Sequence, residues 1–348
     1  MASLLDPGRL IVAALSGPDV APADEAALRD LAPAGAILFA RNLKSAAQTR
    51  DLASALAEIL GRPFLLAVDE EGGKVNRLAE IAPVFRRLPE GRAQGAWGEE
   101  RLRDVWRLVG GALRAVGFNV DFAPVADLDE GPGTNAIGAR SFGLDPGRAA
   151  ALARCVLAGL EDAGVAGCLK HFPGLGGTDL DTHVGLARSP LGEKELWDAH
   201  LRPYVELAKS APLVMTAHAA YPAVEGPEAG PATFSPRLVG EWLRGRIGFS
   251  GLVVSDDLEM GAVAALGAPG ERATRALAAG CDLALFCRGL DAPRRARDEV
   301  AAALESGRLD AAALRSSVAR QATLLARLAA APPAPRWDDA LAALDEAL

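Results

Sequence analysis

Short runs of apolar residues recur along the chain, and longer segments with helical spacing of apolar positions separate them. Each run is rich in β-branched residues or leucine and is bounded by glycine or polar clusters, which is typical of strands buried on both faces of a parallel sheet. The eight runs are Arg9–Leu15, Gly35–Phe39, Phe64–Val68, Asn119–Pro124, Val165–Leu169, Leu213–Thr216, Leu252–Ser255 and Leu283–Phe286. The pattern therefore predicts eight parallel strands.

Amphipathic helical patterns, many of them rich in alanine, lie between most of these runs. The clearest are Ser45–Leu60, Glu99–Val116, Pro146–Ala163, Glu193–Ser210, Pro236–Gly245 and Glu271–Ala279, and a long one follows at about Ala311–Ala330. Eight such β/α units predict an α/β fold, a single-domain (β/α)8 barrel of the TIM type. The alternative is an open doubly wound sheet, whose dinucleotide-binding form lacks its Gly-x-Gly-x-x-Gly turn here. We expect residues 1–330 to form the barrel and residues 331–348 to form a proline-rich linker and a short helix, Asp338–Leu348.

Composition excludes several classes of protein. The chain has 348 residues, 50% of them hydrophobic and 24% charged, which are globular values. The net charge of −8 argues against a nucleic-acid partner. Apolar runs are too short for a membrane span or a secretory signal, and the four cysteines form no Cys-x-x-Cys pair. We therefore expect a cytoplasmic protein with reduced thiols.

Polar residues follow the predicted strands, at the end of a barrel where active sites form. They are Arg41, Asn42, Asp69, Glu70, Glu71, Gly72, Gly73, Asp127, Lys170, His171, His218, Asp256, Asp257 and Arg288. The fifth strand leads into the sequence KHFPGLGGTDLDTHVGL, whose Pro-Gly-Leu-Gly-Gly run predicts a long loop over the barrel mouth. In that loop Asp181 can orient and charge His183, because imidazole titrates near neutral pH. Taken alone, the same pair also fits a solvated loop, and His200 fits a surface or packing position in a helix.

The segment KHFPGLGGTDLDTH resembles the glycoside hydrolase family 3 β-N-acetylglucosaminidases, whose pattern is close to K-H-F-P-G-H-G-x-x-x-x-D-S-H. Four further stretches match in order: VDEEGGKVNRL (Val68–Leu78), NVDFAPVADL (Asn119–Leu128), NAIGARSFG (Asn135–Gly143) and VVSDDLEMGA (Val253–Ala262). The resemblance extends over roughly Leu10 to Leu328, so it covers most of the chain.

This resemblance implies a role for each matching residue. Asp256 corresponds to the catalytic nucleophile, and a carboxylate at a strand end can attack an anomeric carbon. His183 corresponds to the acid/base, with Asp181 as its partner. The residues implied in substrate binding are Asp69, Arg77, Arg140, Lys170, His171, Met215 and His218. Read without the family, Asp256 or Asp257 could instead cap the following helix, and we assign that role to Asp257.

The implied activity is retaining exo-hydrolysis of terminal β-linked N-acetylglucosamine through a covalent intermediate, without a metal or an organic cofactor. The implied substrate is a small carbohydrate or a cell-wall muropeptide, and a monomer is expected. A chitooligosaccharide or another β-N-acetylglucosaminide stays open as the natural substrate. The sequence departs from the family at Leu175, Thr182, Glu70 and Lys74, and Leu175 removes a polar group from the acid/base loop. Three alternatives stay open: a sugar-binding or regulatory barrel, a phosphorylase, and an aldolase that forms a Schiff base on Lys170.

Overall fold

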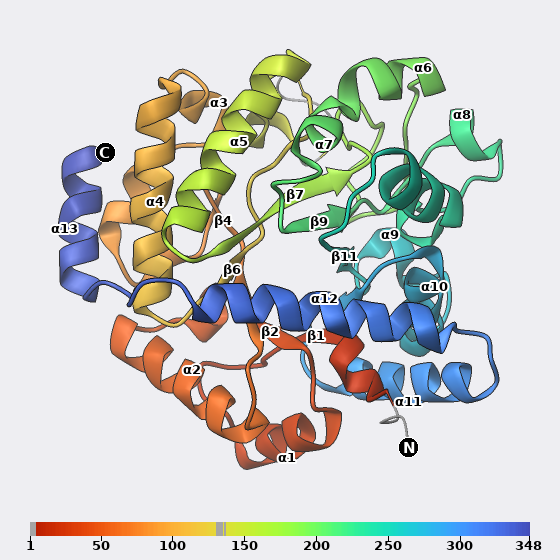
Figure 1. Cartoon of the computed structure of the whole chain (residues 1–348), viewed down its shortest axis with the longest axis horizontal. Helices are drawn as coiled ribbons and strands as arrows, with labels where there is room; N and C mark the ends of the chain where they lie inside the picture. The colour runs from red at the N-terminus through yellow and green to blue at the C-terminus, as the bar shows by residue number, and fades with distance from the viewer. Residues whose placement is uncertain (1–4, 130–134, 136) are drawn as a thin grey trace.

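The computed structural model describes residues 5–129, 135 and 137–348. Within these residues, eight parallel strands form a closed barrel, which confirms the predicted fold (Figure 1). Around the barrel the strands follow the order β1-β12-β11-β9-β7-β6-β3-β2. They are β1 (Ile11–Ala14), β2 (Gly35–Ile37), β3 (Leu65–Val68), β6 (Val120–Asp121), β7 (Ala166–Phe172), β9 (Leu213–Thr216), β11 (Leu252–Asp257) and β12 (Leu283–Phe286). Each predicted apolar run overlaps one of them, although β7 and β11 extend beyond their runs.

Helices surround the barrel and, in the described residues, follow the predicted pattern with five additional α-helices and two irregularities. The α-helices are α1 (Pro22–Leu31), α2 (Ala46–Leu60), α3 (Gly91–Gln94), α4 (Glu99–Ala115), α5 (Pro146–Asp162), α6 (Glu193–Glu195), α7 (Arg202–Leu207), α8 (Pro222–Glu225), α9 (Gly261–Ala264), α10 (Pro269–Ala279), α11 (Asp291–Glu305), α12 (Ala311–Ala329) and α13 (Trp337–Ala347). The additional helices are α1, α3, α8, α9 and α11. The predicted helix Glu193–Ser210 is interrupted by a π-helical turn, η6 (Leu196–His200). Pro203 follows that turn and lacks the N–H that a continuous helix would need. The predicted helix Pro236–Gly245 is π-helical throughout, η8 (Pro236–Arg246).

The hydrophobic core has two layers because alternate strand residues point to opposite sides of the barrel wall. One layer fills the inside of the barrel with side chains from the eight strands, among them Val12, Ile37, Val120 and Leu285. The other lies between the strands and the surrounding helices and includes Leu66, Trp106 and Phe286. The barrel is therefore a packed core whose open end is set by the loops.

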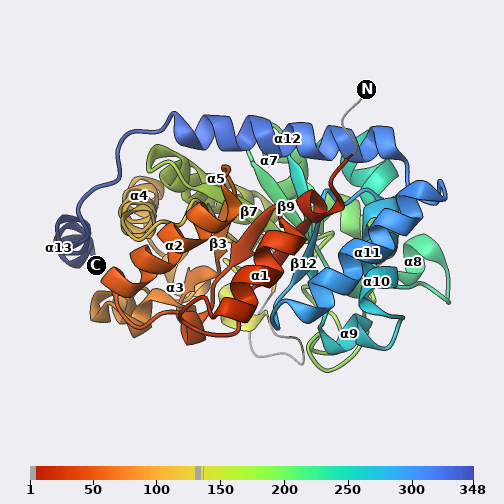
Figure 2. The ribbon, with the colours of Figure 1, turned by 90° about the horizontal axis from the view of Figure 1, so that it is seen from below.

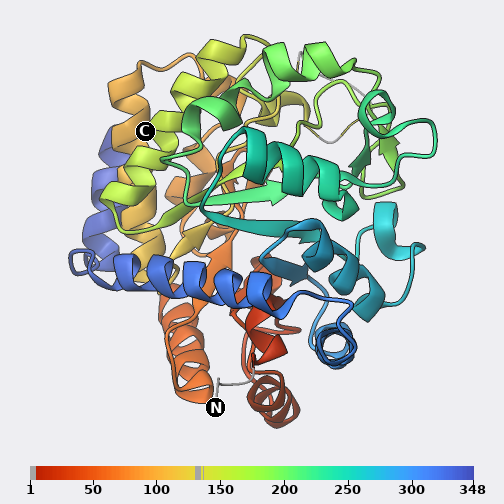
Figure 3. The same cartoon turned by 45° about the vertical axis from the view of Figure 1, so that its right-hand side comes forward.

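Helix α12 closes one end of the barrel. It lies across the N-terminal ends of the strands, and its Leu324, Leu325 and Leu328 join the inner core layer (Figures 1 and 2). Strands β7, β9 and β11 run away from α12 toward the loops at the opposite end (Figure 3). Helix α13 packs along α4 at the edge of the molecule. The C-terminal ends of the strands are thus the end left for a site.

Within the described residues, no helix is long and apolar enough to cross a membrane.

Candidate active site

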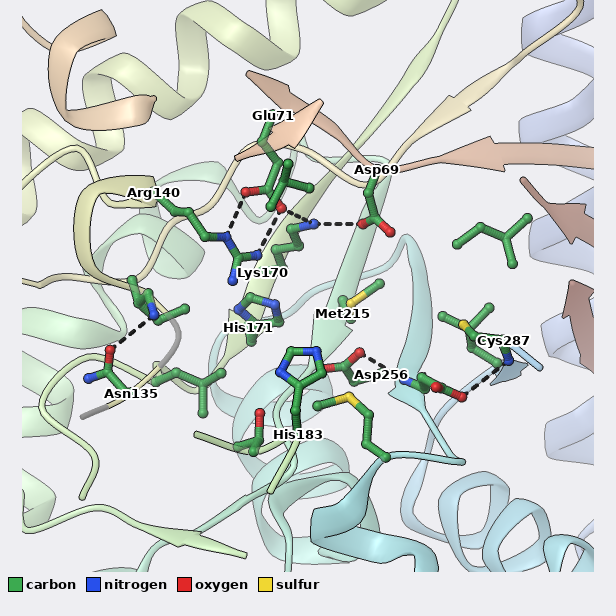
Figure 4. Close-up of a pocket in the computed structure, with 18 of the residues that line it drawn as sticks. Asp69, Glu71, Asn135, Arg140, Lys170, His171, His183, Met215, Asp256 and Cys287 are labelled. Atoms are coloured by element: carbon green, nitrogen blue, oxygen red, sulfur yellow. Dashed lines mark hydrogen bonds and ion pairs between the residues drawn. The ribbon is translucent and has the colours of Figure 1, made fainter. Parts of the chain in front are cut away.

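A cavity of about 240 Å³ opens at the C-terminal ends of the strands. Ligand pockets for larger molecules have volumes of about 300–1,000 Å³, so this cavity suits one small polar molecule. Eight of the ten site residues predicted from the sequence line it: Asp69, Arg77, Arg140, Lys170, His171, His183, Met215 and Asp256 (Figure 4). The other two, Asp181 and His218, contact residues of this wall from behind.

A chain of ion pairs forms one wall of the cavity. Lys170 Nζ lies 2.8 Å from Asp69 Oδ1 and 2.6 Å from Glu71 Oε1. Arg140 binds Glu71 in a bidentate manner, with its Nε and Nη2 each 2.8 Å from a Glu71 oxygen. Such paired geometry fixes both charged donors and acceptors in place. The wall therefore presents directed hydrogen-bonding groups, as recognition of a sugar requires.

These charges stay ionised in spite of their burial. Burial alone would raise the pKa of Glu71, but Arg140 and Lys170 together hold it well below its usual range. Burial would likewise lower the pKa of Lys170, yet Asp69 and Glu71 raise it above the ordinary value. A Schiff-base aldolase needs a neutral amine, so this geometry argues against that alternative for Lys170. Glu71 has no assigned role in the sequence reading, although it stands among the residues that follow the third strand.

The Glu-Glu-Gly-Gly sequence that follows β3 explains how this wall is built. It forms a small antiparallel hairpin, β4 (Glu70–Gly72) with β5 (Val75–Asn76). Gly72 turns the chain at φ +84°, and a Cβ there would lie 2.4 Å from the Pro89 carbonyl oxygen. In this hairpin the Glu71 side chain lies within ion-pair distance of Arg140 and Lys170. Glu70 is fully buried instead, with its Oε2 accepting from the Leu78 N–H at 3.0 Å.

A buried carboxylate holds His171 in the cavity wall. Asp127, which follows β6, lies 2.7 Å from His171 Nδ1 and also accepts from the His171 and Leu175 N–H groups. A carboxylate only accepts, so His171 Nδ1 carries the proton and its Nε2 is left for a ligand. Leu175 contributes its backbone N–H to this cluster, while its side chain is an apolar part of the wall.

Asp256 and Asp257 end β11, and the pKa values of their carboxyl groups are shifted in opposite directions. Burial alone would raise the pKa of Asp256, but His218, His171 and the Asp257 N–H together lower it. Asp256 is therefore ionised at neutral pH, as a nucleophile must be. Burial and the neighbouring charge of Asp256 raise the pKa of Asp257 to about 6.

The predicted helix cap at Asp257 is wrong. Helix α9 begins at Gly261, and its N-cap residue, Met260, makes no side-chain cap. Asp257 Oδ1 accepts instead from the N–H groups of Glu259 and Cys287, at 2.9 and 3.2 Å. The carboxylate closes a turn and joins the ends of β11 and β12.

His218 lies behind the cavity wall. It is fully buried, with Nε2 2.9 Å from the Asp257 carbonyl oxygen and Nδ1 2.8 Å from Thr233 Oγ1. Burial lowers its pKa. This position supports the strand end that carries Asp256 and places no His218 atom on the cavity surface. Met215, from β9, does line the cavity.

His183 reaches the cavity from the loop after β7. Asp181 Oδ1 accepts from the His183 N–H at 2.8 Å and lies 2.7 Å from its Nδ1. Burial alone would raise the pKa of Asp181, but hydrogen bonds from His183 lower it. The imidazole of His183 and the carboxylate of Asp256 point toward one another (Figure 4). The His183 side chain is 65% exposed, so protons can exchange with solvent there.

Two further sequence expectations concern neighbouring positions. His200 is buried on η6, and a Cβ added to Gly174 would lie 3.1 Å from its ring, so it is a packing residue and not a surface one. Ala136, within the motif Asn135–Gly143, lies outside the described residues. In the ranges that the structure describes, no group of three or more histidine, cysteine or acidic side chains is placed to hold a metal ion.

Comparison with known proteins gives consistent matches. Residues 10–324 match the glycosyl hydrolase family 3 N terminal domain. A β-hexosaminidase of Pseudomonas aeruginosa is 40% identical over 267 residues, which cover 76% of this chain and 78% of that protein. A β-hexosaminidase of Xylella fastidiosa is 42% identical over 273 residues, covering 75% and 78%. The structure of a glycoside hydrolase family 3 β-N-acetylglucosaminidase from Paenibacillus sp. matches with a TM-score of 0.90 and 34% identity, over 100% of this chain and 68% of that one.

Proposed function

The chain belongs to glycosyl hydrolase family 3 and is a glycoside hydrolase acting on β-N-acetylhexosamines, and from this premise we propose that it is a retaining exo-β-N-acetylglucosaminidase. In this proposal Asp256 is the nucleophile and His183, held by Asp181, is the acid/base. The observation that supports it most is that an ionised Asp256 and a solvent-accessible His183 point toward one another in one cavity.

The reaction that we propose is a double displacement. Asp256 attacks the anomeric carbon while His183 Nε2 gives its proton to the departing glycosidic oxygen, and a covalent glycosyl ester forms. His183 then takes a proton from water, which attacks the same carbon and releases the sugar with its original configuration. In the structure Asp181 bonds His183 Nδ1, which leaves Nε2 as the atom that would exchange the proton.

The wall of ion pairs supplies the binding of the terminal sugar. Asp69, Lys170 and Arg140 direct acceptors and donors into the cavity, where sugar hydroxyls need short directed bonds. His171 Nε2 and Arg77 add further donors or acceptors from the sides. A cavity of about 240 Å³ fits one ring, which supports exo-cleavage of a terminal residue.

We further propose a cell-wall muropeptide as the natural substrate, cleaved in the cytoplasm by a monomer. The resemblance of the motifs to the family supports these finer statements. Activity on a purified muropeptide relative to a chitooligosaccharide tests the first, and light scattering of the purified protein tests the oligomeric state.

The direct test of the reaction is release of p-nitrophenol from its β-N-acetylglucosaminide. We expect D256N to lose at least about 10³-fold in kcat, because it removes the nucleophile but keeps the shape. The matched control is D257N, the same change one residue on, which we expect to stay within about tenfold of the wild type. An inactive wild type that still binds N-acetylglucosamine would favour a binding barrel, and a rate that requires phosphate would favour a phosphorylase.

A further inference from the structure

The loop that carries His183 rests on the segment that follows the nucleophile. Beyond Asp256 the chain turns into the short helix α9, and the Ala262 N–H in its first turn donates to the Thr182 carbonyl oxygen at 3.1 Å. Thr182 is buried, whereas Val184, two residues later, is 73% exposed. The loop is thus attached to α9 immediately before the acid/base residue.

Gly261 is the point of closest approach in this contact. A Cβ added to Gly261 would lie 2.5 Å from the carbonyl oxygen of His183 and 2.9 Å from that of Val184. Side-chain carbons essentially never come this close to other heavy atoms, and the atoms concerned are backbone, so no rotamer change can relieve the clash. A side chain at this position would therefore displace the backbone of His183 itself.

The requirement for glycine here is steric and not conformational. Gly261 is absent from the glycines with positive φ, and it begins a helix, where alanine is favoured over glycine. Alanine can therefore adopt the backbone conformation of residue 261 without strain. The absence of a side chain serves only to let the loop approach.

We propose that Gly261 is a positioning residue for the acid/base. Because it has no side chain, the His183 loop packs directly against α9, and this contact fixes the position of the imidazole relative to Asp256. This inference rests on the role of His183 proposed above. Gly261 lies five residues after Asp256 on the same β/α connection, so the segment that carries the nucleophile also positions the loop that carries the acid/base.

The test uses leaving groups that differ in their need for a proton. p-Nitrophenol leaves readily without protonation, whereas the sugar leaving group of N,N′-diacetylchitobiose needs it. For G261A we expect kcat/KM on diacetylchitobiose to fall about 10- to 100-fold, as a displacement of about 1 Å can produce. On the p-nitrophenyl substrate we expect a change below about threefold, because kcat/KM reports only the first displacement.

The matched control is G192A. Gly192 precedes α6 with φ −70°, and a Cβ there would meet no atom within 4 Å, so both substrates should react as with the wild type. A second variant, A262P, removes the N–H that bonds Thr182 and is tolerated in the first turn of a helix. It should show the same dependence on leaving group, and it serves if G261A fails to fold.

The possible outcomes distinguish a failure of this inference from a failure of the proposed acid/base role of His183. Equal losses on both substrates in both variants would overturn the inference, because a distorted site would be slow with either leaving group. Wild-type behaviour of both variants, with H183A impaired only on diacetylchitobiose, would also overturn it and leave the role of His183 intact. An H183A variant with no preference between leaving groups would instead refute the proposed acid/base.

Discussion

Glu70 is one of the positions at which the sequence departs from the family pattern, and its buried carboxyl makes the stability of the fold depend on pH. The side chain is fully buried at the base of the β4–β5 hairpin. Burial raises its pKa from 4.5 to about 8, and neighbouring N–H groups, that of Leu78 first, offset this only in part. Asp121 lies beside it and accepts from the Glu70 N–H at 2.9 Å, and burial raises its pKa as well. Glu70 is therefore mostly protonated in the native protein at neutral pH.

The size of the effect follows from proton linkage. Between pH 4.5 and about 8, Glu70 is protonated when folded and ionised when unfolded, so the folded state binds more protons and stability falls as pH rises. One such group lowers the free energy of unfolding by about 1.4 kcal/mol per pH unit, or about 5 kcal/mol over the interval. E70Q removes this dependence, so the variant should gain stability relative to the wild type at each higher pH.

The assay is urea unfolding of the wild type and E70Q at intervals from about pH 5 to about pH 8. The readout is how the difference in free energy of unfolding between E70Q and the wild type changes with pH. Any effect of how well the glutamine side chain packs is the same at every pH, so it does not change this slope. E58Q, the same change at an exposed position of α2, is the matched control for the loss of one carboxyl group. A slope near zero for E70Q would refute the assignment of Glu70 as a buried neutral acid.

Three other substitutions test the rest of the site. D181N should lower kcat/KM on diacetylchitobiose roughly tenfold. The loss should be no larger, because the ion pair of Asp181 with His183 is partly exposed and therefore screened by solvent. Unchanged kinetics would show that Asp181 does not assist the acid/base His183. K170M should lower the free energy of unfolding by about 3–5 kcal/mol in urea, because it removes the cation that pairs with Asp69 and one of the two cations that pair with Glu71. An unchanged free energy of unfolding would contradict this account of the ion pairs. L175A should lower the free energy of unfolding by about 2–5 kcal/mol, because it creates a cavity where the buried side chain packs. The variant keeps the backbone N–H that bonds Asp127, so a large loss of kcat in the folded variant would contradict the structural role given to Leu175.

The strands could be predicted from the sequence because burial on both faces leaves continuous apolar runs. Their ends could not, since β7 extends to Phe172 and β11 to Asp257 through charged residues that still pair with neighbouring backbones. Helices α1 and α11 were not among the clear patterns, because each presents a narrow apolar stripe on a largely polar sequence.

The site divides in the same way. Strand-end positions predicted which residues share the cavity, since parallel strands bring their carboxyl ends together. Which of them pair could not be predicted: Glu71 bonds Arg140 from 69 positions away, and Asp127 bonds His171 from 44. Those contacts depend on the hairpin geometry and on the register of neighbouring strands, which no local pattern in the sequence records.

The central claim is that Asp256 forms a covalent bond with the sugar while His183 moves the proton. It is tested most directly by mass spectrometry of H183A after reaction with p-nitrophenyl β-N-acetylglucosaminide. This leaving group departs without an acid, and the missing base slows release, so a glycosyl ester should accumulate. The account predicts one N-acetylhexosaminyl adduct, located on Asp256 by peptide mapping and absent from the D256N/H183A variant. An adduct on another residue, or product of inverted configuration with no adduct, would contradict it.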